Sequence, residues 1–157
     1  MYNIAVFGST GLIGSNILKC LEYDNYFSKV NVITRKPIHH KNSKFKNIVI
    51  DFNDINSIKN SLKNCQIVFV SIGTTQSKVN WNLEKYKKID YEIPINIAKE
   101  AKKLNIKKYL IVSSAGADIN AKGFYLSLKG QIEKDIKKIG IKNIFIFRPS
   151  LLMGNRK

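Results

Sequence analysis

Two periodicities alternate along the chain. Strands buried on both faces are typically short, almost continuous apolar runs, and such runs occur at residues 2–7, 30–34, 47–50, 67–71, 109–113 and 144–147. Between them, apolar residues recur every three or four positions, which predicts helices over about residues 11–21, 55–62, 86–104 and 122–139. Pro94 interrupts the third helix and should kink it or begin a new first turn. Strands that alternate with helices predict an α/β fold, a doubly wound parallel sheet with helices on both faces.

Composition narrows the class of protein. A chain of 157 residues suits a single domain, residues 1–157, with a core of its own. No apolar run approaches the length of a membrane span, and Met1 and Tyr2 lead straight into the first strand without a secretory signal. Cys20 and Cys65 are far apart, form no CxxC pattern and are expected to be buried free thiols. We therefore expect a cytoplasmic protein with no membrane partner.

The formal net charge of +16 raises the question of nucleic-acid binding. Lysines carry almost all of the positive charge and are scattered along the chain, which favours a solvated surface over a specific nucleic-acid face. Such a surface still attracts anionic ligands. His39 and His40 are interpreted as solvated residues, and no metal site is predicted.

A glycine-rich turn joins the first strand to the first helix. Gly8, Gly11 and Gly14 form a GxxGxxG pattern within the segment IAVFGSTGLIG. Gly8 allows a sharp turn off the strand, Gly11 allows the backbone to approach a pyrophosphate, and Gly14 allows close packing of the helix on the strand. The amides at the helix start and the positive end of the helix dipole then bind phosphate. In this context the turn predicts a Rossmann-type dinucleotide site rather than a plain strand–helix connection.

The end of the second strand indicates which dinucleotide binds. An NAD-preferring site carries Asp or Glu there for the ribose 2′-hydroxyl, and neither residue occurs between Val30 and Asp51. Arg35 stands at this place instead, and its guanidinium suits the 2′-phosphate of NADPH. Asp51 closes the third strand, where it either meets the adenine or caps the helix that begins near Ile55.

A tyrosine and a lysine share one face of the last predicted helix. Tyr125 and Lys129 are four residues apart, and the same face continues as an apolar stripe, where a lysine is unusual. The Lys129 ammonium would stabilise a tyrosinate at Tyr125, which would act as general acid or base on a carbonyl or hydroxyl group. Ser113 and Ser114 follow the fifth strand, and one of them would donate a hydrogen bond to the substrate oxygen. The alternative is a core tyrosine beside a lysine that reaches solvent.

Together these residues resemble the short-chain dehydrogenase/reductase superfamily. The resemblance is carried by GSTGLIG at 8–14, VITRKP at 32–37, SIGTT at 71–75, VSSAGA at 112–117, YLSLKG at 125–130 and FRPSLLMG at 147–154. Within the superfamily, the chain is most similar to the atypical group that includes the Tat-interacting protein.

The resemblance implies a sheet ordered 3-2-1-4-5-6 and bound NADP(H). The residues that it assigns to the cofactor phosphates are Ser9, Thr10, Gly11, Leu12 and Ile13, with Arg35 and Lys36 on the 2′-phosphate. It places Ile72 and Gly73 along the cofactor, Pro149, Ser150 and Leu152 beside the nicotinamide, and Tyr125 with Lys129 as the active-site pair. Members of the group continue past the FRPSLLMG segment, so the chain is expected to lack a C-terminal region that helps build their substrate pocket.

Two functions are compatible with these residues. The first is an NADPH-dependent oxidoreductase that acts on a small carbonyl or hydroxyl substrate. The second is a non-catalytic NADPH sensor, which needs the glycine turn and Arg35 but no Tyr–Lys chemistry. The presence of Tyr125 and Lys129 favours the first function, and the expected lack of the C-terminal region favours the second.

Overall fold

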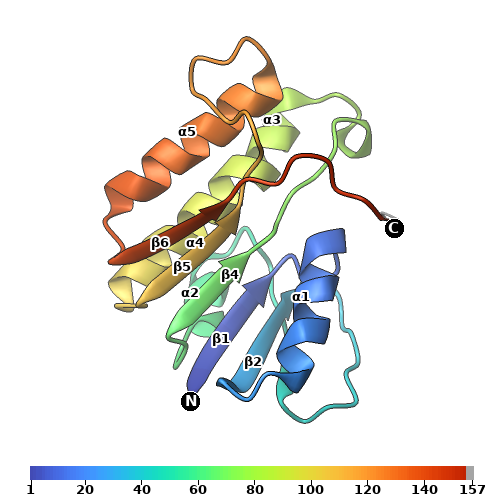
Figure 1. Ribbon diagram of the computed structural model, residues 1–157, viewed down its shortest axis with the longest axis vertical. Coiled ribbons are helices and arrows are strands. Elements are labelled where there is room, and N and C mark those ends of the chain that lie inside the picture. Colours follow the sequence, from blue (N-terminus) through green and yellow to red (C-terminus); the bar gives the residue numbers. More distant parts are fainter. Residues whose placement is uncertain (155–157) are drawn as a thin grey trace.

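Six parallel strands form the sheet, in the order β3-β2-β1-β4-β5-β6 (Figure 1). They are β1 (Tyr2–Phe7), β2 (Phe27–Thr34), β3 (Phe45–Val49), β4 (Ile67–Val70), β5 (Lys108–Val112) and β6 (Asn143–Phe147). This order confirms the doubly wound α/β fold and the expected arrangement 3-2-1-4-5-6. The computed structural model describes residues 1–154, so residues 155–157 of the predicted domain lie outside the described part.

Helices connect all the neighbouring strands in sequence except β2 and β3, which residues 35–44 join without a helix. They are α1 (Leu12–Tyr23), α2 (Ile55–Ser61), the short 3₁₀ turn η1 (Ser77–Val79), α3 (Leu83–Lys87), α4 (Ile93–Lys103) and α5 (Phe124–Ile139). A π-helical turn, η2 (Lys88–Glu92), joins α3 to α4. The helix predicted over residues 86–104 is therefore widened near its start, and Pro94 stands in the first turn of α4. In the part of the chain that the structure describes, no helix has both the length and the apolar character needed to cross a bilayer.

Successive residues of β1 face opposite sides of the sheet. Ile4 and Val6 belong to the smaller apolar cluster, which α1 covers. Ala5 and Phe7 belong to the larger cluster, which α2, α4 and α5 cover. The alternation explains why β1 reads as a continuous apolar run, since both of its faces are buried.

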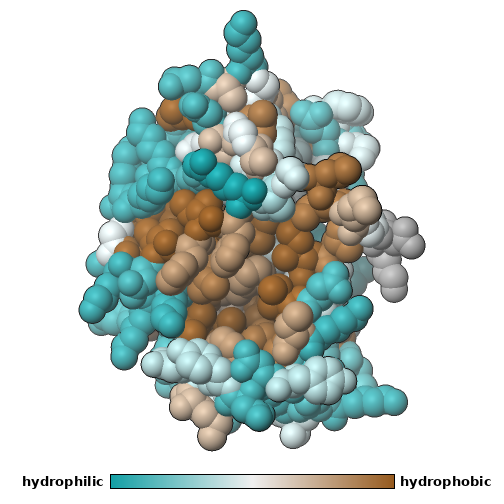
Figure 2. Space-filling view, in the orientation of Figure 1, coloured by the Kyte–Doolittle hydropathy of each residue, from teal (hydrophilic) through white to brown (hydrophobic). Residues whose placement is uncertain are grey.

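The face of the sheet that carries α1 is left partly open over β6. Phe145 and Phe147 of β6 are 45% and 48% exposed. The Phe147 ring centroid lies 6.4 Å from that of Phe69 on β4, so the open area continues from the cluster under α1. Figure 2 shows apolar side chains gathered on this face of the molecule. Within residues 1–154, α1 thus covers the β1–β2 half of this face, and no helix covers the β5–β6 half.

The two cysteines lie in different surroundings, and both are free thiols. Cys65 is buried, and burial raises the pKa of its thiol to about 11. Cys20 is exposed, so the expectation that both cysteines are buried is wrong for this residue. The reason is its place on α1, where Leu18 and Leu21 face the sheet and Cys20 falls between them on the solvent side.

Candidate functional site

The strand order reverses between β1 and β4, and this leaves a crevice at the carboxyl ends of the strands. Phe7 at the end of β1 pairs with Ile33 of β2 on one side and with Val70 of β4 on the other. The three strands therefore end at the same edge, where the loops at Gly8 and Ser71 meet. Crevices at this position bind the ligands of doubly wound sheets.

Two positions of the glycine turn have no room for a side chain. Gly8 has a φ of +80°, and a Cβ there would lie 2.6 Å from the backbone carbonyl of Ser71. A Cβ at Gly14 would lie 2.2 Å from the Gly8 oxygen. The Gly11 amide donates to that same oxygen at 3.0 Å, which closes the turn. The sharp turn and the close packing of helix on strand are thus present at the positions where they were expected.

The start of α1 offers hydrogen-bond donors to an anion. Gly11 is the N-cap, so no side chain caps the first amides, and no acidic residue stands in the first turn. These amides have no partner within the helix, and the helix dipole adds positive potential. Ser9 is 2% exposed, and its hydroxyl has no hydrogen-bond partner in the described part of the chain. A buried unpartnered hydroxyl beside available amides fits the diphosphate of a dinucleotide.

One cleft brings together predicted residues from the two ends of the sequence. Those that line it are Thr10, Gly11, Leu12, Ile13, Ile72, Gly73, Ser113, Tyr125, Lys129 and Leu152. Residues that line it without having been predicted are Ser71, Thr74, Lys78, Asp90 and Val112. The phosphate loop and the Tyr–Lys pair are more than a hundred residues apart in the sequence, yet both line this cleft.

A second hollow lies at the ends of β2 and β3. Arg35 and Asp51 both line it, together with Phe52 and with Lys88 from η2. Lys88 is a second cation that the sequence did not single out, because it reaches this hollow from a different element. Among the described residues, Lys36 and Ser114 line neither the cleft nor this hollow.

The helix-cap interpretation of Asp51 is wrong. Asp54 is the N-cap of α2, and its carboxylate accepts hydrogen bonds from the amides of Asn56 and Ser57. Asp51 lies three residues too early for that role and accepts instead from the Asn53 amide at 2.8 Å. Asp51 is exposed at the hollow that Arg35 shares.

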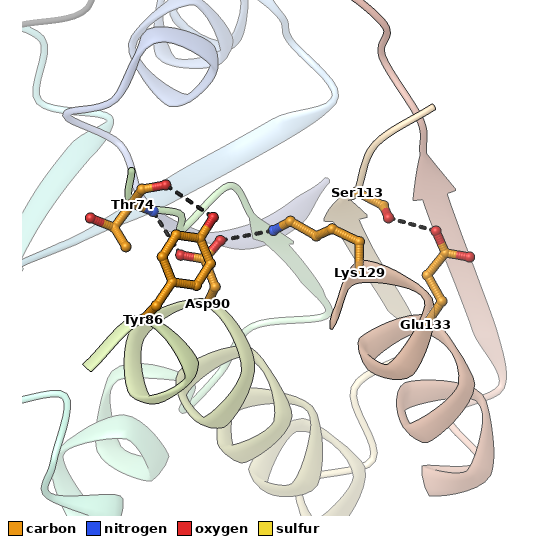
Figure 3. A network of polar contacts seen from close by, with 6 residues as sticks. All are labelled: Thr74, Tyr86, Asp90, Ser113, Lys129 and Glu133. Atoms are coloured by element: carbon orange, nitrogen blue, oxygen red, sulfur yellow. Dashed lines mark hydrogen bonds and ion pairs between the residues drawn. The ribbon is translucent and has the colours of Figure 1, made fainter. Parts of the chain in front are cut away.

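Tyr125 and Lys129 share one face of α5, but the ammonium is bound elsewhere. Lys129 is buried, and its Nζ lies 3.0 Å from Asp90 Oδ2. The same nitrogen lies 5.8 Å from the centre of the Tyr125 ring, and Tyr125 is 42% exposed. Figure 3 shows the Lys129 side chain extending from α5 to Asp90. A lysine that reaches solvent is therefore not what the structure shows.

Ser113 lines the cleft with its hydroxyl already engaged. It donates to Glu133 Oε1 at 2.5 Å (Figure 3), and Arg148 holds the two oxygens of Glu133 at 3.0 and 2.5 Å. Burial alone would raise the pKa of Glu133, but hydrogen bonds from Arg148 and Ser113 hold that pKa below its usual value. The Ser114 hydroxyl donates to the Ala115 carbonyl at 3.2 Å.

Asp90 is the principal site residue that the sequence reasoning missed. Its carboxylate is buried and accepts from the Thr74 amide at 2.7 Å as well as from Lys129. Burial raises the pKa of the Asp90 carboxyl, and the charge of Lys129 opposes that rise only in part. A signal was present, because Asp90 stands four residues after Tyr86 and seven before Ile97, on the stripe that faces the core.

A family model described as NAD(P)H-binding matches residues 8–152. The chain belongs to the NAD(P)H-binding family. The match begins at Gly8 in the glycine turn and ends at Leu152 on the far side of the cleft. The matched segment therefore includes the residues on both sides of the cleft.

Curated relatives of this NAD(P)H-binding chain are proteins named FMP52, mitochondrial. The protein from Candida albicans is 34% identical over 156 residues, which cover 97% of this chain and 68% of the relative. The protein from Saccharomyces cerevisiae is 31% identical over 166 residues and is covered to 67%. The chain thus spans about two thirds of the length of these relatives. Their mitochondrial names overturn the expectation of a cytoplasmic protein, which rested on a missing secretory signal that says nothing about mitochondria.

Solved structures share the fold at low sequence identity. The X-ray structure of Pen from Bacillus thuringiensis has a TM-score of 0.79 and 21% identity, covering 92% of this chain and 48% of that one. WbmH of Bordetella bronchiseptica, in complex with NAD+, has a TM-score of 0.78 and 18% identity, covering 100% and 58%. Uronate dehydrogenase from Agrobacterium tumefaciens has a TM-score of 0.75 and 16% identity, covering 91% and 59%. The NAD(P)H-binding chain spans about half the length of these proteins and has their Rossmann-like fold.

Proposed function

We propose that the chain is an NADPH-dependent oxidoreductase of the short-chain dehydrogenase/reductase type, acting on a small carbonyl or hydroxyl substrate. The observation that carries the proposal is the shared cleft, in which Tyr125 and Lys129 face residues 10–13 of the phosphate loop. The Tyr125 hydroxyl, which can exchange a proton, and a loop that fits a dinucleotide thus line the same cleft.

Arg35 supports NADPH rather than NADH. It stands just past β2 and lines the hollow with Lys88, so two cations are available to the 2′-phosphate. Lys36 is exposed beside Arg35 and adds positive charge. Asp51, across the same hollow, is assigned to the adenine. The diphosphate is assigned to residues 8–14, and the path toward the nicotinamide is assigned to Ile72, Gly73 and Leu152, which line the cleft.

The chain's own groups would handle the proton. Tyr125 donates it to a carbonyl oxygen or removes it from a hydroxyl, and Lys129, on the same face of α5, binds the ribose. The chemistry supplied by a bound dinucleotide is hydride transfer to or from the adjacent carbon. We assign the substrate-oxygen contact to Ser113, which lines the cleft and would exchange its bond to Glu133 for one to the substrate. Ser114 is the alternative.

A second candidate is a non-catalytic NADPH-binding protein. One observation favours it: the Lys129 ammonium is paired with Asp90 at 3.0 Å and lies 5.8 Å from the Tyr125 ring centre. In such a protein the pair would stabilise the fold, and the dinucleotide would only be bound.

Cofactor choice is tested by calorimetric titration of the 157-residue chain with NADPH and with NADH, repeated with Arg35→Ala. We expect tighter binding of NADPH, because a bidentate contact to the 2′-phosphate is lost with NADH. Arg35→Ala should remove the preference and leave NADH affinity within about twofold. Equal affinity of the native chain for both nucleotides would refute the NADPH assignment.

Catalysis is tested by NADPH oxidation against a panel of small aldehydes and ketones. Tyr125→Phe should abolish turnover while NADPH affinity stays within a few-fold, since the variant loses only the hydroxyl. An equally active Tyr125→Phe protein would remove this mechanism. No turnover with any carbonyl, in a protein that binds NADPH, would favour the non-catalytic candidate.

A further inference from the structure

The starts of the strands form an edge of the sheet that lies opposite the cleft. The strands pair in parallel, so they all begin at this edge and end at the crevice. In Figure 1 the starts of β1, β4, β5 and β6 follow the lower left side of the molecule. We call the row of strand starts from β2 to β6 the amino edge, and it consists of residues 26–27, 2–3, 66–67, 107–108 and 142–143.

Hydrogen bonds connect the amino edge from strand to strand. The Gln66 amide donates to the Asn3 carbonyl at 3.0 Å, and the Lys107 amide donates to the Gln66 carbonyl at 3.0 Å. Asn143 Nδ2 donates to the Lys107 carbonyl at 3.1 Å. The starts of β1, β4, β5 and β6 therefore lie side by side, and their side chains share one surface.

Lysines that are scattered along the sequence gather at this edge. Lys63, Lys107 and Lys142 stand just before β4, β5 and β6 and are exposed, and no ion pair within residues 1–154 involves any of them. The last turns of α4 and α5 add Lys102, Lys103, Lys137 and Lys138. Two of these four are ion-paired within their own helices. The helix dipole accounts for lysines in a last turn, but it does not account for the three that precede strands.

Acidic residues lie mainly at one end of the amino edge. Glu22 stands in the last turn of α1 and Asp24 follows that helix, where Asp24 Oδ1 accepts the Tyr26 amide at 2.7 Å. The positive potential is therefore strongest over β4, β5 and β6. Like charges that gather without counter-ions repel one another, and an anionic partner relieves this repulsion.

Tyrosines lie beside the lysines on the same edge. The Tyr2 and Tyr26 rings are 4.8 Å apart between centroids, and Lys108 Nζ lies 5.8 Å from the centre of each ring. Tyr26 is 46% exposed, and Tyr23 at the end of α1 is 84% exposed. Lys108 belongs to β5, so its side chain reaches past β4 to the two rings. From β2 to β6, cations and exposed aromatic rings thus share a row of about 19 Å, at about 4.8 Å between strands.

We propose that the amino edge binds single-stranded nucleic acid without sequence preference. Lys107 and Lys142 contact phosphates of the strand, and bases stack on Tyr23 and Tyr26. A positive row that follows the backbone and aromatic rings that accept any base are the two components of such sites. The length of the row suits about four nucleotides, the smallest size of such sites. The edge is separate from the cleft, so this inference does not depend on the proposed function.

The tyrosines favour a single strand over the other anionic partners. Bases of a duplex are already stacked on each other, so exposed rings gain nothing from them. A helix or edge that binds a bilayer presents an apolar face to the acyl chains, whereas the rings at this edge carry hydroxyl groups and lie among lysines. Unpaired bases use both the rings and the cations.

Fluorescence anisotropy with a labelled oligothymidylate of about 20 nucleotides tests the site, at salt concentrations from about 50 to about 200 mM. The double variant Lys107→Gln with Lys142→Gln should bind about tenfold more weakly at the lowest salt. Its slope of log Kd against log salt should fall by about 1.4, because each lost phosphate contact removes about 0.7 from that slope. Tyr26→Ala should weaken binding about tenfold and leave the slope unchanged, since stacking releases no counter-ions.

Lys85→Gln with Lys122→Gln is the matched control. Lys85 stands on α3 and Lys122 just before α5, and both are exposed at the crevice end of the molecule. The control removes the same net charge and should leave affinity within about twofold. Equal losses in the two lysine pairs would reduce the binding to net charge and overturn the site. Tyr23→Ala replaces an almost fully exposed ring and repeats the stacking test should Tyr26→Ala not fold.

Three further outcomes decide which partner occupies which surface. Saturating NADPH should leave oligonucleotide affinity within about twofold, because the amino edge and the cleft lie at opposite ends of the strands. Displacement by NADPH would place the oligonucleotide on the phosphate loop and overturn the proposal. Native affinity in both tyrosine variants would leave a surface for any polyanion and overturn the assignment to single strands. Flotation with phosphatidylcholine vesicles that contain about 30% phosphatidylserine, in a chain that does not bind the oligonucleotide, would assign the edge to a membrane instead.

Discussion

The two halves of the sheet use different chemistry at the same crevice. In the β1–β3 half, the buried polar residues are neutral: Ser9, Thr34 and Ser61. The buried charged residues of the described chain all follow β4, and they are Asp90, Glu100, Lys129 and Glu133. Beside the glycine turn, the first half therefore presents backbone amides and small neutral groups, whereas the second half presents buried, paired charges.

This difference has a physical origin. The glycine turn closes largely on itself, because Gly11 and Gly14 both lie against the Gly8 carbonyl, and Gly8 in turn packs on the Ser71 backbone after β4. Two charge pairs near the cleft in the second half instead join different elements, Asp90 with Lys129 and Glu133 with Arg148. A change in the first half should therefore act by steric exclusion, and a change in the second half by leaving a charge unpaired.

The largest effect is expected from Gly14→Ala in the first half. The new Cβ would lie 2.2 Å from the Gly8 oxygen, so α1 or the loop must move. We expect a loss of about 2–3 kcal/mol in the free energy of unfolding, as for an overpacked core. NADPH binding should be lost because the phosphate amides are displaced. Urea unfolding and calorimetric titration measure the two effects.

Gly123→Ala is the control for Gly14→Ala, since a Cβ at Gly123 would meet no atom within 4 Å. It should cost less than about 1 kcal/mol, the price of a poorer N-cap for α5. Equal losses in the two variants would show that the close packing of Gly14 does not matter.

A smaller effect is expected from Glu133→Gln in the second half. The change weakens the bonds from Ser113 and Arg148, which should cost about 2 kcal/mol at neutral pH. Because the pKa of Glu133 is held below its ordinary 4.5, its contribution is present above pH 4.5 and is lost as pH falls through the lowered value. The stability difference between the native chain and the variant should therefore shrink on acidification, as followed by urea unfolding.

Glu84→Gln provides the comparison for Glu133→Gln. Glu84 forms an exposed ion pair with Lys87 at 3.7 Å, so its loss should cost less than about 0.5 kcal/mol at any pH. A Glu133→Gln difference that grows as pH falls would contradict the assigned hydrogen bonds.

The glycine turn and the strand order could be predicted because their signals lie within short segments. GxxGxxG follows an apolar run and precedes an amphipathic helix, and the structure has both elements at those positions. Alternating strands and helices likewise indicate a parallel sheet without knowledge of any long-range contact. The helix that carries Cys20 was predicted, but the burial of Cys20 was predicted wrongly. A shift of one residue along a helix is enough to move a side chain from the core side to the solvent side.

The charged part of the site could not be predicted in full because its pairs are not local. Lys129 stood out on an apolar stripe, but its partner is 39 residues earlier in the chain. Asp90 reaches it from a π turn, and helical periodicity does not predict a widened turn. Lys88, which lies on the same π turn, reaches the hollow that Arg35 lines from the end of β2. Pairing of this kind follows from how elements pack, which local patterns do not encode.

The smallest effect separates the two roles that the sequence left open for Asp51, the helix cap and the adenine contact, by comparing Asp51 with the neighbouring Asp54. Asp54 caps α2 through the amides of Asn56 and Ser57, so Asp54→Ala should cost about 1 kcal/mol in the free energy of unfolding. NADPH affinity should not change. Asp51→Ala should do the reverse, with stability within about 0.5 kcal/mol and weaker NADPH binding, because Asp51 lines the hollow of Arg35 and caps no helix. Paired urea and calorimetric measurements on both variants distinguish these roles, and native NADPH affinity in Asp51→Ala would place the adenine contact on another residue.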